Sequence, residues 1–324
     1  MKKLLSLALS LCLLVGCSSQ PNDQSTSNVK EVGILQLLTH DALDKAREGF
    51  IDALKDGGYV EGENLKINYQ NPEADQANLS TMADSLIAAD PDLILAIATS
   101  PVQQLQNIND HTPILATAVT DFVAAGLVDS NENPGGLISG VSDGFPMDTQ
   151  LDLLLEAVDV KTLGILYTSS EPNSQIQAEQ MVAECESRGI KTMVKTVSDK
   201  TMIDDTMQSF IGQIDALYVP TDNNIAAAFA SVDIVASENK IPVLAGESNV
   251  VKNGALLSLG ADYYKIGYQT GEMAVEILNG DKKITDFAIQ FQKDVDVYYN
   301  AKTAAKIGLE LPQSIIDKGI DVSK

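Results

Sequence analysis

Ala216-Leu-Tyr-Val-Pro-Thr-Asp-Asn-Asn224 is the stretch that decides the fold. It reads as a short apolar strand that stops abruptly at hydroxyl, carboxylate and amide groups, and an alanine-rich helical run follows directly. In an open parallel sheet, ligands bind at the carboxyl ends of the strands. The stretch therefore predicts an α/β fold that carries polar side chains at one edge of a sheet.

An earlier stretch has the same order of residue types. Asp92-Leu-Ile-Leu-Ala-Ile-Ala-Thr-Ser-Pro101 is also an apolar strand that ends at hydroxyl groups before a helix. The next strand of each set matches as well, since Thr112-Pro-Ile-Leu-Ala-Thr117 follows the first and Ile241-Pro-Val-Leu-Ala-Gly246 follows the second. We expect a structural duplication in which two similar lobes face each other across a cleft.

The first residues have the pattern of a lipoprotein signal. Two lysines precede an apolar run, Leu4–Leu14, and the tetrapeptide Leu14-Val-Gly-Cys17 follows at once. We expect residues 1–16 to be a signal peptide, Cys17 to carry a diacylglyceryl group, and residues 17–29 to form a flexible polar tether. A plain signal peptide with an incidental cysteine is the alternative.

Composition and charge narrow the function. Without residues 1–16 the chain keeps 308 of its 324 residues and has a net charge of about −25, from 20 basic and 45 acidic residues. This charge argues against nucleic acid as a partner, because phosphates would be repelled. No later apolar run reaches the ~18–20 residues of a membrane helix. We therefore expect an exported, soluble body that the lipid alone holds at the extracytoplasmic face of a membrane, with Cys185 buried and unpaired.

Strands and helices alternate along the rest of the chain, at lengths typical of doubly wound sheets. We expect two doubly wound parallel-sheet lobes, joined by a hinge, with a ligand cleft between them. The first lobe is predicted to comprise residues 30–141 plus about 261–285. The second is predicted to comprise residues 142–260 plus about 286–324.

The signatures of common enzymes are missing. The chain has no Gly-x-x-x-x-Gly-Lys-Ser/Thr loop, no Gly-x-Gly-x-x-Gly after its first strand and no Gly-x-Ser-x-Gly elbow, which favours binding over catalysis. Its two histidines, His40 and His111, lie near no second metal ligand at a zinc-site spacing. We expect both to be solvated, with a ligand contact by His40 as the alternative. The sequence predicts a protein that is not an enzyme and binds no metal or cofactor.

Polar side chains recur at the predicted strand ends. Together they would line the cleft, although each one alone is equally explained as a helix N-cap. The candidate ligand-binding residues are Gln36, Thr99, Ser100, Thr120, Asp121, Ser142, Tyr167, Ser174, Thr221, Asp222, Asn223, Glu247 and Asp262.

These groups suit an α-amino acid. Thr99 and Ser100 open a helix with Pro101 in its first turn, so free N–H groups and hydroxyls there can hold a carboxylate. Asp222 has no adjacent basic residue and can accept a charge-assisted bond from an ammonium group. Sugars are the rival ligand, but sugar clefts stack rings on aromatic faces, and this chain has no Trp and only 5% aromatic residues.

Nine motifs spread over the chain resemble a known family. They are Val32-Gly-Ile-Leu-Gln36, Ala46-Arg-Glu-Gly-Phe-Ile-Asp-Ala-Leu54, Gly58-Tyr-Val-Glu-Gly62, Asn68-Tyr-Gln-Asn71, Asp75-Gln-Ala-Asn78, Ala118-Val-Thr-Asp121, Gly140-Val-Ser-Asp143, Tyr218-Val-Pro-Thr-Asp-Asn223 and Asp262-Tyr-Tyr-Lys265. With them the chain resembles the lipid-anchored substrate-binding proteins of ABC importers, specifically the tryptophan/tyrosine-binding family.

The resemblance implies a monomer whose two lobes close on an aromatic L-amino acid, tryptophan foremost, and deliver it to a cognate ABC permease. The alternatives are a binding protein for another amino acid, a sugar or a nucleoside, and a lipid-anchored enzyme or assembly factor of the cell envelope. Closing of the lobes around a ligand would distinguish a binding protein from an enzyme, which needs an activated nucleophile.

Overall fold

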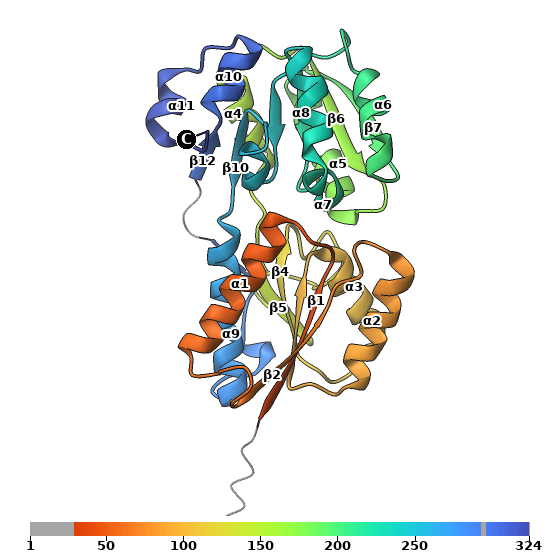
Figure 1. Ribbon diagram of the computed structural model, residues 1–324, viewed down its shortest axis with the longest axis vertical. Helices are drawn as coiled ribbons and strands as arrows, with labels where there is room; N and C mark the ends of the chain where they lie inside the picture. Colours follow the sequence, from red (N-terminus) through yellow and green to blue (C-terminus); the bar gives the residue numbers. More distant parts are fainter. Residues whose placement is uncertain (1–28, 293–295, 324) are drawn as a thin grey trace, which may run out of the picture.

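The computed structural model describes residues 29–292 and 296–323. These residues form two α/β lobes stacked along the long axis of the molecule (Figure 1). The predicted signal peptide, Cys17 and all but the last residue of the predicted tether lie outside the described residues. No helix in the described ranges is long and apolar enough to cross a membrane.

The first lobe is built on a parallel sheet with the strand order β11-β5-β4-β3-β1-β2. Helices α1 and α9 cover one face of this sheet, and α2 and α3 cover the other. The strands are β1 (Lys30–Gln36), β2 (Leu65–Gln70), β3 (Leu93–Ile97), β4 (Ile114–Val119), β5 (Ile138–Ser142) and β11 (Gln290–Phe291). The helices are α1 (Asp41–Asp56), α2 (Gln76–Ala88), α3 (Thr99–Ile108), α9 (Tyr263–Asn279) and the short η3 (Ile284–Asp286).

The second lobe has the strand order β13-β12-β10-β9-β8-β6-β7. One face of its sheet packs on α4, α5, α10 and α11, and the other on α6, α7 and α8. The strands are β6 (Thr162–Thr168), β7 (Lys191–Val197), β8 (Ala216–Val219), β9 (Val243–Ala245), β10 (Leu257–Gly260), β12 (Asp296–Tyr299) and β13 (Gly319–Asp321). The helices are α4 (Met147–Ala157), α5 (Pro172–Ser187), η1 (Lys200–Met202), α6 (Ile203–Gln208), α7 (Asn223–Ala227), α8 (Phe229–Glu238), η2 (Ser248–Val251), α10 (Ala301–Ile307) and α11 (Gln313–Lys318).

The predicted duplication is confirmed by the strand orders. The first five strands of the chain lie in the order β2-β1-β3-β4-β5 and the next five in the order β7-β6-β8-β9-β10, which is the same topology. The two sequence stretches that look alike form β3 and β8, the third strand of each set, and the strands after them are β4 and β9. In this topology, the switch point where ligands bind lies between the first and third strands.

The chain passes between the lobes three times, after β5, after β10 and after β11. Since β11 pairs with β5, the chain stays with the first sheet through Phe291, whereas the sequence indicated a return at about residue 286. Strand β12 is the one antiparallel neighbour within the described sheets. Strand β10 leaves its sheet at the carboxyl end to reach the first lobe. The returning chain enters at that same end and must therefore run the other way.

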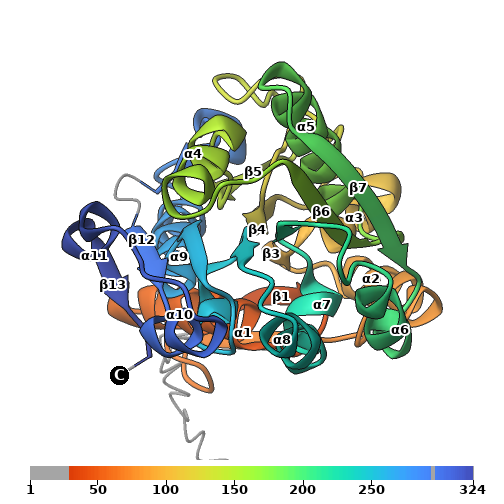
Figure 2. The same ribbon diagram turned by 90° about the horizontal axis from the view of Figure 1, so that it is seen from above.

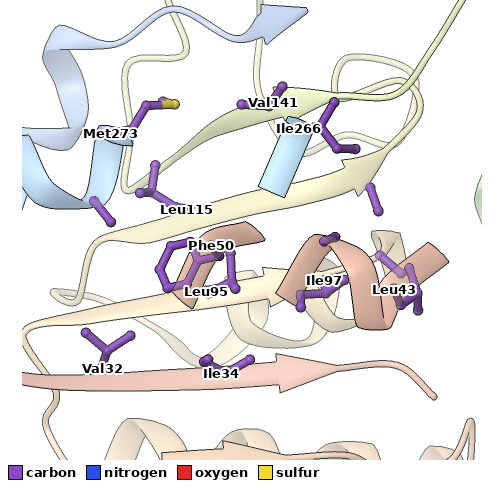
Figure 3. Packing of buried hydrophobic residues seen from close by; sticks show 14 of the residues in the cluster. Val32, Ile34, Leu43, Phe50, Leu95, Ile97, Leu115, Val141, Ile266 and Met273 are labelled. Atoms are coloured by element: carbon purple, nitrogen blue, oxygen red, sulfur yellow. The ribbon is translucent and has the colours of Figure 1, made fainter. Parts of the chain in front are cut away.

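The core of the first lobe joins segments that are far apart in the sequence. Figure 3 shows Val32 of β1 and Leu95 of β3 under Phe50 of α1, with Ile266 and Met273 of α9 beside them. All five side chains are buried. The last third of the chain therefore completes the core that its first third begins.

Helices α1 and α9 approach so closely that only glycine fits at their contact. A Cβ atom on Gly267 of α9 would lie 1.9 Å from the Ala46 carbonyl oxygen of α1. A Cβ atom on Gly49 of α1 would lie 2.1 Å from the Tyr264 carbonyl oxygen of α9. Real Cβ contacts are never this short, so these glycines are required by packing.

Candidate functional site: the boundary between the lobes

The carboxyl ends of the strands of both lobes meet at the boundary between the lobes. Two hydrogen bonds cross it directly: His40 Nε2 lies 3.1 Å from Asn223 Oδ1, and Gln177 Nε2 donates to Thr120 Oγ1 at 3.3 Å. His40 and Thr120 follow strands of the first lobe, whereas Asn223 and Gln177 begin or belong to helices of the second. The lobes therefore touch, and polar groups from both are buried between them.

On the first lobe, the backbone at the strand ends is strained. Ala98, directly after β3, has φ = 83° and ψ = 160°, a region that side chains other than glycine rarely adopt. Thr99 is buried and Ser100 half-buried at the start of α3. The side chain at the N-cap of α3 makes no capping hydrogen bond, so the first N–H groups of this helix have no side-chain acceptor there.

Gln36, at the end of β1, is fully buried but bonded within its own lobe. Its Nε2 donates to the Leu38 carbonyl at 2.9 Å and to Asp44 Oδ1 at 2.8 Å, and its Oε1 accepts from Arg47 at 2.7 Å. The structure gives Gln36 the role of joining β1 to helix α1.

On the second lobe, Asp222 links the ends of β8 and β6. Its Oδ2 accepts from the Thr168 backbone N–H at 2.6 Å, and its Oδ1 accepts from the Thr168 hydroxyl at 2.8 Å and from the Ile225 N–H at 2.9 Å. Asp222 is thus the N-cap of α7 as well as a buried bridge at the switch point. Its oxygens already have donors from the protein, which does not support the predicted role of holding a ligand ammonium group.

Glu171 organises the neighbouring asparagines. Its Oε2 accepts from the N–H and the side-chain Nδ2 of Asn223, at 3.0 and 2.6 Å, and its Oε1 accepts from the same two groups of Asn224, at 2.8 and 2.7 Å. Burial raises the pKa of Glu171, and the nearby charge of Asp222 raises it further. The side chain of Asn223 is therefore fixed in one orientation.

Gln177 of α5 accepts hydrogen bonds from the turn at Thr221. Its Oε1 accepts from the Thr221 hydroxyl at 3.0 Å and from the Thr221 N–H at 3.2 Å. The Thr221 carbonyl in turn accepts from Asn173 Nδ2 at 2.6 Å and from the Ser174 hydroxyl at 3.4 Å. Thr221 and Ser174 therefore lie together inside the second lobe.

His40 contradicts the expectation that it is solvated. Its side chain is 6% exposed, and its Nδ1 lies 3.8 Å from Glu247 Oε1 of the second lobe. Burial lowers the pKa of His40, opposed by the bond to Asn223 and by the charges of Asp44 and Asp41. The residue does begin helix α1, as the sequence indicated, but the second lobe covers that helix start. His111, by contrast, is exposed and bonded to Asp90 and Asp110, as expected.

Glu247 and Asp143 are two buried carboxyl groups at the same boundary. Glu247 is 3% exposed, and His40 is its ion-pair partner in the described part of the chain. Asp143 Oδ2 accepts from the Tyr263 hydroxyl at 2.8 Å, while its Oδ1 is buried without a well-formed hydrogen bond, with the Thr120 side chain close by. Burial raises the pKa of Glu247 well above its usual range, and the charge of Asp143 raises it further.

Four predicted site residues lie toward the edges of the boundary or away from it. Asp121 and Ser142 line a groove of about 720 Å³ on the side where the chain crosses, with Phe145 and Phe291. Asp262 caps helix α9 and lines a separate groove of about 250 Å³. Tyr167 is half-buried and packs against the core of the second lobe.

His40 was predicted at this boundary only as an alternative, and six further residues were not predicted there: Asp143, Thr168, Glu171, Asn173, Gln177 and Tyr263. Asp143 could have been found, since it ends a strand that carries Ser142. Glu171 and Gln177 lie within or before a helix, and no strand-end pattern points to them. In the described ranges, no group of three or more His, Cys, Asp or Glu side chains is arranged to hold a metal ion.

Comparisons with known proteins agree with this architecture. The family model described as ABC transporter substrate binding protein matches residues 31–322. The tyrosine-binding protein of Clostridioides difficile (strain R20291) is 38% identical over 322 residues, which cover 95% of this chain and 93% of the relative.

Two solved structures show the fold in different states. A protein from Streptococcus pneumonia in complex with L-Trp superposes with a TM-score of 0.85 at 33% identity. The ligand-free, open structure of a substrate-binding protein with adhesive properties from Clostridium difficile superposes with a TM-score of 0.69 at 40% identity. Each comparison covers 90% of this chain and 99% of the other.

Proposed function

Because the chain belongs to the family of ABC transporter substrate-binding proteins, we propose that it captures an aromatic L-amino acid, tryptophan foremost, in the cleft between its lobes. It then presents this ligand to the permease of its importer. The family has the two-lobe α/β fold described above, and its relatives are binding proteins rather than enzymes.

The observation that carries the proposal is a set of buried carboxyl groups without a Lys or Arg partner in the described part of the chain. Glu247, Asp143, Asp222 and Glu171 are all buried at or near the lobe boundary. Among the residues that the structure describes, no Lys or Arg lies within ion-pair distance of any of them. Buried charges in proteins are normally paired, so this set matches a ligand that supplies a cation, as the ammonium group of an amino acid does.

Glu247 and Asp143 are the partners we assign to that ammonium group. Asp222 and Glu171 have their oxygens occupied by three and four donors of the second lobe. Glu247 has only the distant His40 contact, and Asp143 keeps one buried oxygen without a well-formed bond. Charge-assisted hydrogen bonds from an ammonium group would satisfy both carboxylates.

The opposite end of the ligand fits the start of helix α3. Thr99 and Ser100 lie there beside N–H groups that no side chain caps, directly after the strained Ala98. A helix N-terminus with free N–H groups binds carboxylates. Ammonium and carboxylate sites on opposing strand ends define an α-amino acid.

The aromatic side chain and the closed state are supported by the relatives. One relative is a tyrosine-binding protein and one similar structure holds L-Trp. The TM-score is higher against the L-Trp complex than against the open, ligand-free structure, although the latter is more similar in sequence. Since both cover the same share of the chain, the difference reflects lobe arrangement and supports a closed form here.

The proposal includes the location of the protein. Residues 1–16 act as a signal peptide, Cys17 carries the lipid, and the body works as a monomer on the extracytoplasmic side, where substrate-binding proteins of importers are found. The residues that follow Cys17 are polar in sequence, which fits a tether between the lipid and the body.

Tryptophan fluorescence tests the ligand directly, because the chain has no Trp. L-Trp is titrated into the body starting at residue 18, after denaturation, dialysis and refolding to remove any retained ligand, with excitation at the red edge of tyrosine absorption. A saturable, blue-shifted emission supports tryptophan in an apolar cleft. If no shifted emission appears, competing amino acids, sugars and nucleosides are screened by thermal shift. Binding of a ligand without an ammonium group would contradict the proposal.

A further inference from the structure

A chain of four side chains crosses the boundary between the lobes. It runs from Glu171 to Asn223 in the second lobe, to His40 in the first lobe, and back to Glu247 in the second. We call this set the interlobe chain. His40 is its single member from the first lobe, so whatever the ring does depends on how the two lobes sit.

The second-lobe half of the interlobe chain fixes the proton on His40. Asn223 Nδ2 donates to Glu171 Oε2 at 2.6 Å, so its Oδ1 is the atom that faces the ring. An inverted amide would place an oxygen against the Glu171 carboxyl group. Because Asn223 Oδ1 can only accept, His40 Nε2 must carry the hydrogen and donate it.

The first-lobe half holds the ring in place. His40 lies at the N-cap position of α1, yet its side chain makes no capping bond and points to the other lobe instead. The preceding residue is held by its lobe, since the Thr39 hydroxyl donates to Glu73 Oε1 at 2.6 Å and accepts from Asn71 Nδ2 at 2.9 Å. The loop therefore presents the ring at a set position.

The second nitrogen of the ring faces the ammonium site. Nδ1 lies 3.8 Å from Glu247 Oε1, and the other charged groups near the ring are Asp41 and Asp44 of its own helix. The ring therefore makes one hydrogen bond to the second lobe, to Asn223, and lies near Glu247 without bonding to it.

We propose that His40 is an interlobe latch, a positioning residue that stabilises the closed lobes through its hydrogen bond to Asn223. The bond to Asn223 exists only while the lobes are together, because its two partners belong to different lobes. This inference rests on the proposed function in one respect, namely that binding of an amino acid closes the lobes.

Dissociation kinetics test the latch. Loss of a buried hydrogen bond corresponds to roughly a tenfold change, so His40→Ala and Asn223→Ala should each release L-Trp about ten times faster in stopped-flow displacement. The double variant should be no faster than either single variant, because both remove the same bond. A double variant that releases L-Trp about a hundred times faster than wild type, as two independent tenfold effects would give, would overturn the latch. His111→Ala, at an exposed histidine of the first lobe, is the matched control and should leave the rate unchanged.

A distance measurement separates failure of the latch from failure of the proposed function. Spin labels at Asp84→Cys and Lys195→Cys lie at exposed positions of α2 and β7, and two views show these elements on the same side of the molecule (Figure 1 and Figure 2). If wild type closes with L-Trp, His40→Ala should retain a larger open population at saturation. If no amino acid closes wild type, the proposed function fails. The latch is then tested without ligand, where His40→Ala should have a smaller closed population than wild type. Equal populations in the two proteins would overturn it, and matched thermal unfolding excludes misfolding.

Discussion

Replacing Glu247 by Gln is the sharpest test of the ammonium site. The two side chains have the same shape, so the change removes charge without leaving a cavity. Glu247 is 3% exposed and has no Lys or Arg partner in the described chain, so a ligand ammonium group would be its main counter-charge. Truncating one partner of a buried charged pair costs about 2–5 kcal/mol. Because Asp143 remains nearby, we expect the lower part of this range, about 2–3 kcal/mol, or roughly 30- to 150-fold weaker binding.

The assay is a titration of L-Trp followed by its emission, repeated by calorimetry. Asp121→Asn is the matched control, because Asp121 was also predicted from sequence but lies in the groove beside the crossing strands. That variant should bind within about threefold of wild type. If Glu247→Gln also binds within threefold, the assignment of the ammonium group to Glu247 is refuted. A simultaneous loss of binding in a folded Asp222→Asn variant would return the role to Asp222, as the sequence first indicated.

Three further predictions concern pH, packing and the thiol. Burial raises the pKa of Glu247 and of Asp143 in the empty site. Both must ionise to hold an ammonium group, so binding should release protons and affinity should fall as the pH is lowered. Calorimetry in two buffers of different ionisation enthalpy measures the proton release, and proton uptake would contradict it. Gly267→Ala should lower the free energy of unfolding by about 1–3 kcal/mol, because its Cβ would lie 1.9 Å from the Ala46 carbonyl oxygen. Gly136→Ala is the control, because a Cβ there has open space and should change the free energy of unfolding little. Denaturant titration of both variants measures the difference. Burial of the Cys185 thiol raises its pKa to about 11. The thiol should therefore resist alkylation near pH 8 until the protein is denatured. Rapid labelling of the native protein would contradict this prediction.

The fold could be predicted because its signals are local. Apolar strands such as Leu93–Ile97, fully buried in the structure, are typical of parallel sheets covered on both sides. The two copies of strand, polar end and helix were visible because each uses the same residue types in the same order. Strand β12 was missed because its direction depends on where the chain enters the second sheet, which is a property of the connection between the lobes and not of Asp296–Tyr299 themselves.

The site could be predicted only in part, because the roles of its residues depend on their partners. Thr221, Asp222 and Asn223 do lie at a strand end, but the role of Asp222 follows from Thr168, 54 positions away. From the sequence, His40 resembles an exposed residue at a helix start. Its side chain is buried because the second lobe covers it. Patterns along one chain indicate which side chains share an edge of a sheet. They do not indicate which of them are already satisfied there.

The close contact of α1 with α9 has a consequence for the order in which the protein can be made. The first lobe lacks α9, one of the two helices on one face of its sheet, until residues 263–279 have been synthesised. The second lobe receives β12 and β13 only from residues 296–321. Neither core can be completed while the ribosome is still making the middle of the chain. Contacts between segments that are far apart in the sequence, such as those of α1 with α9, form slowly. Both lobes can therefore complete their folding only after nearly the whole chain has been made, as the export proposed above would require.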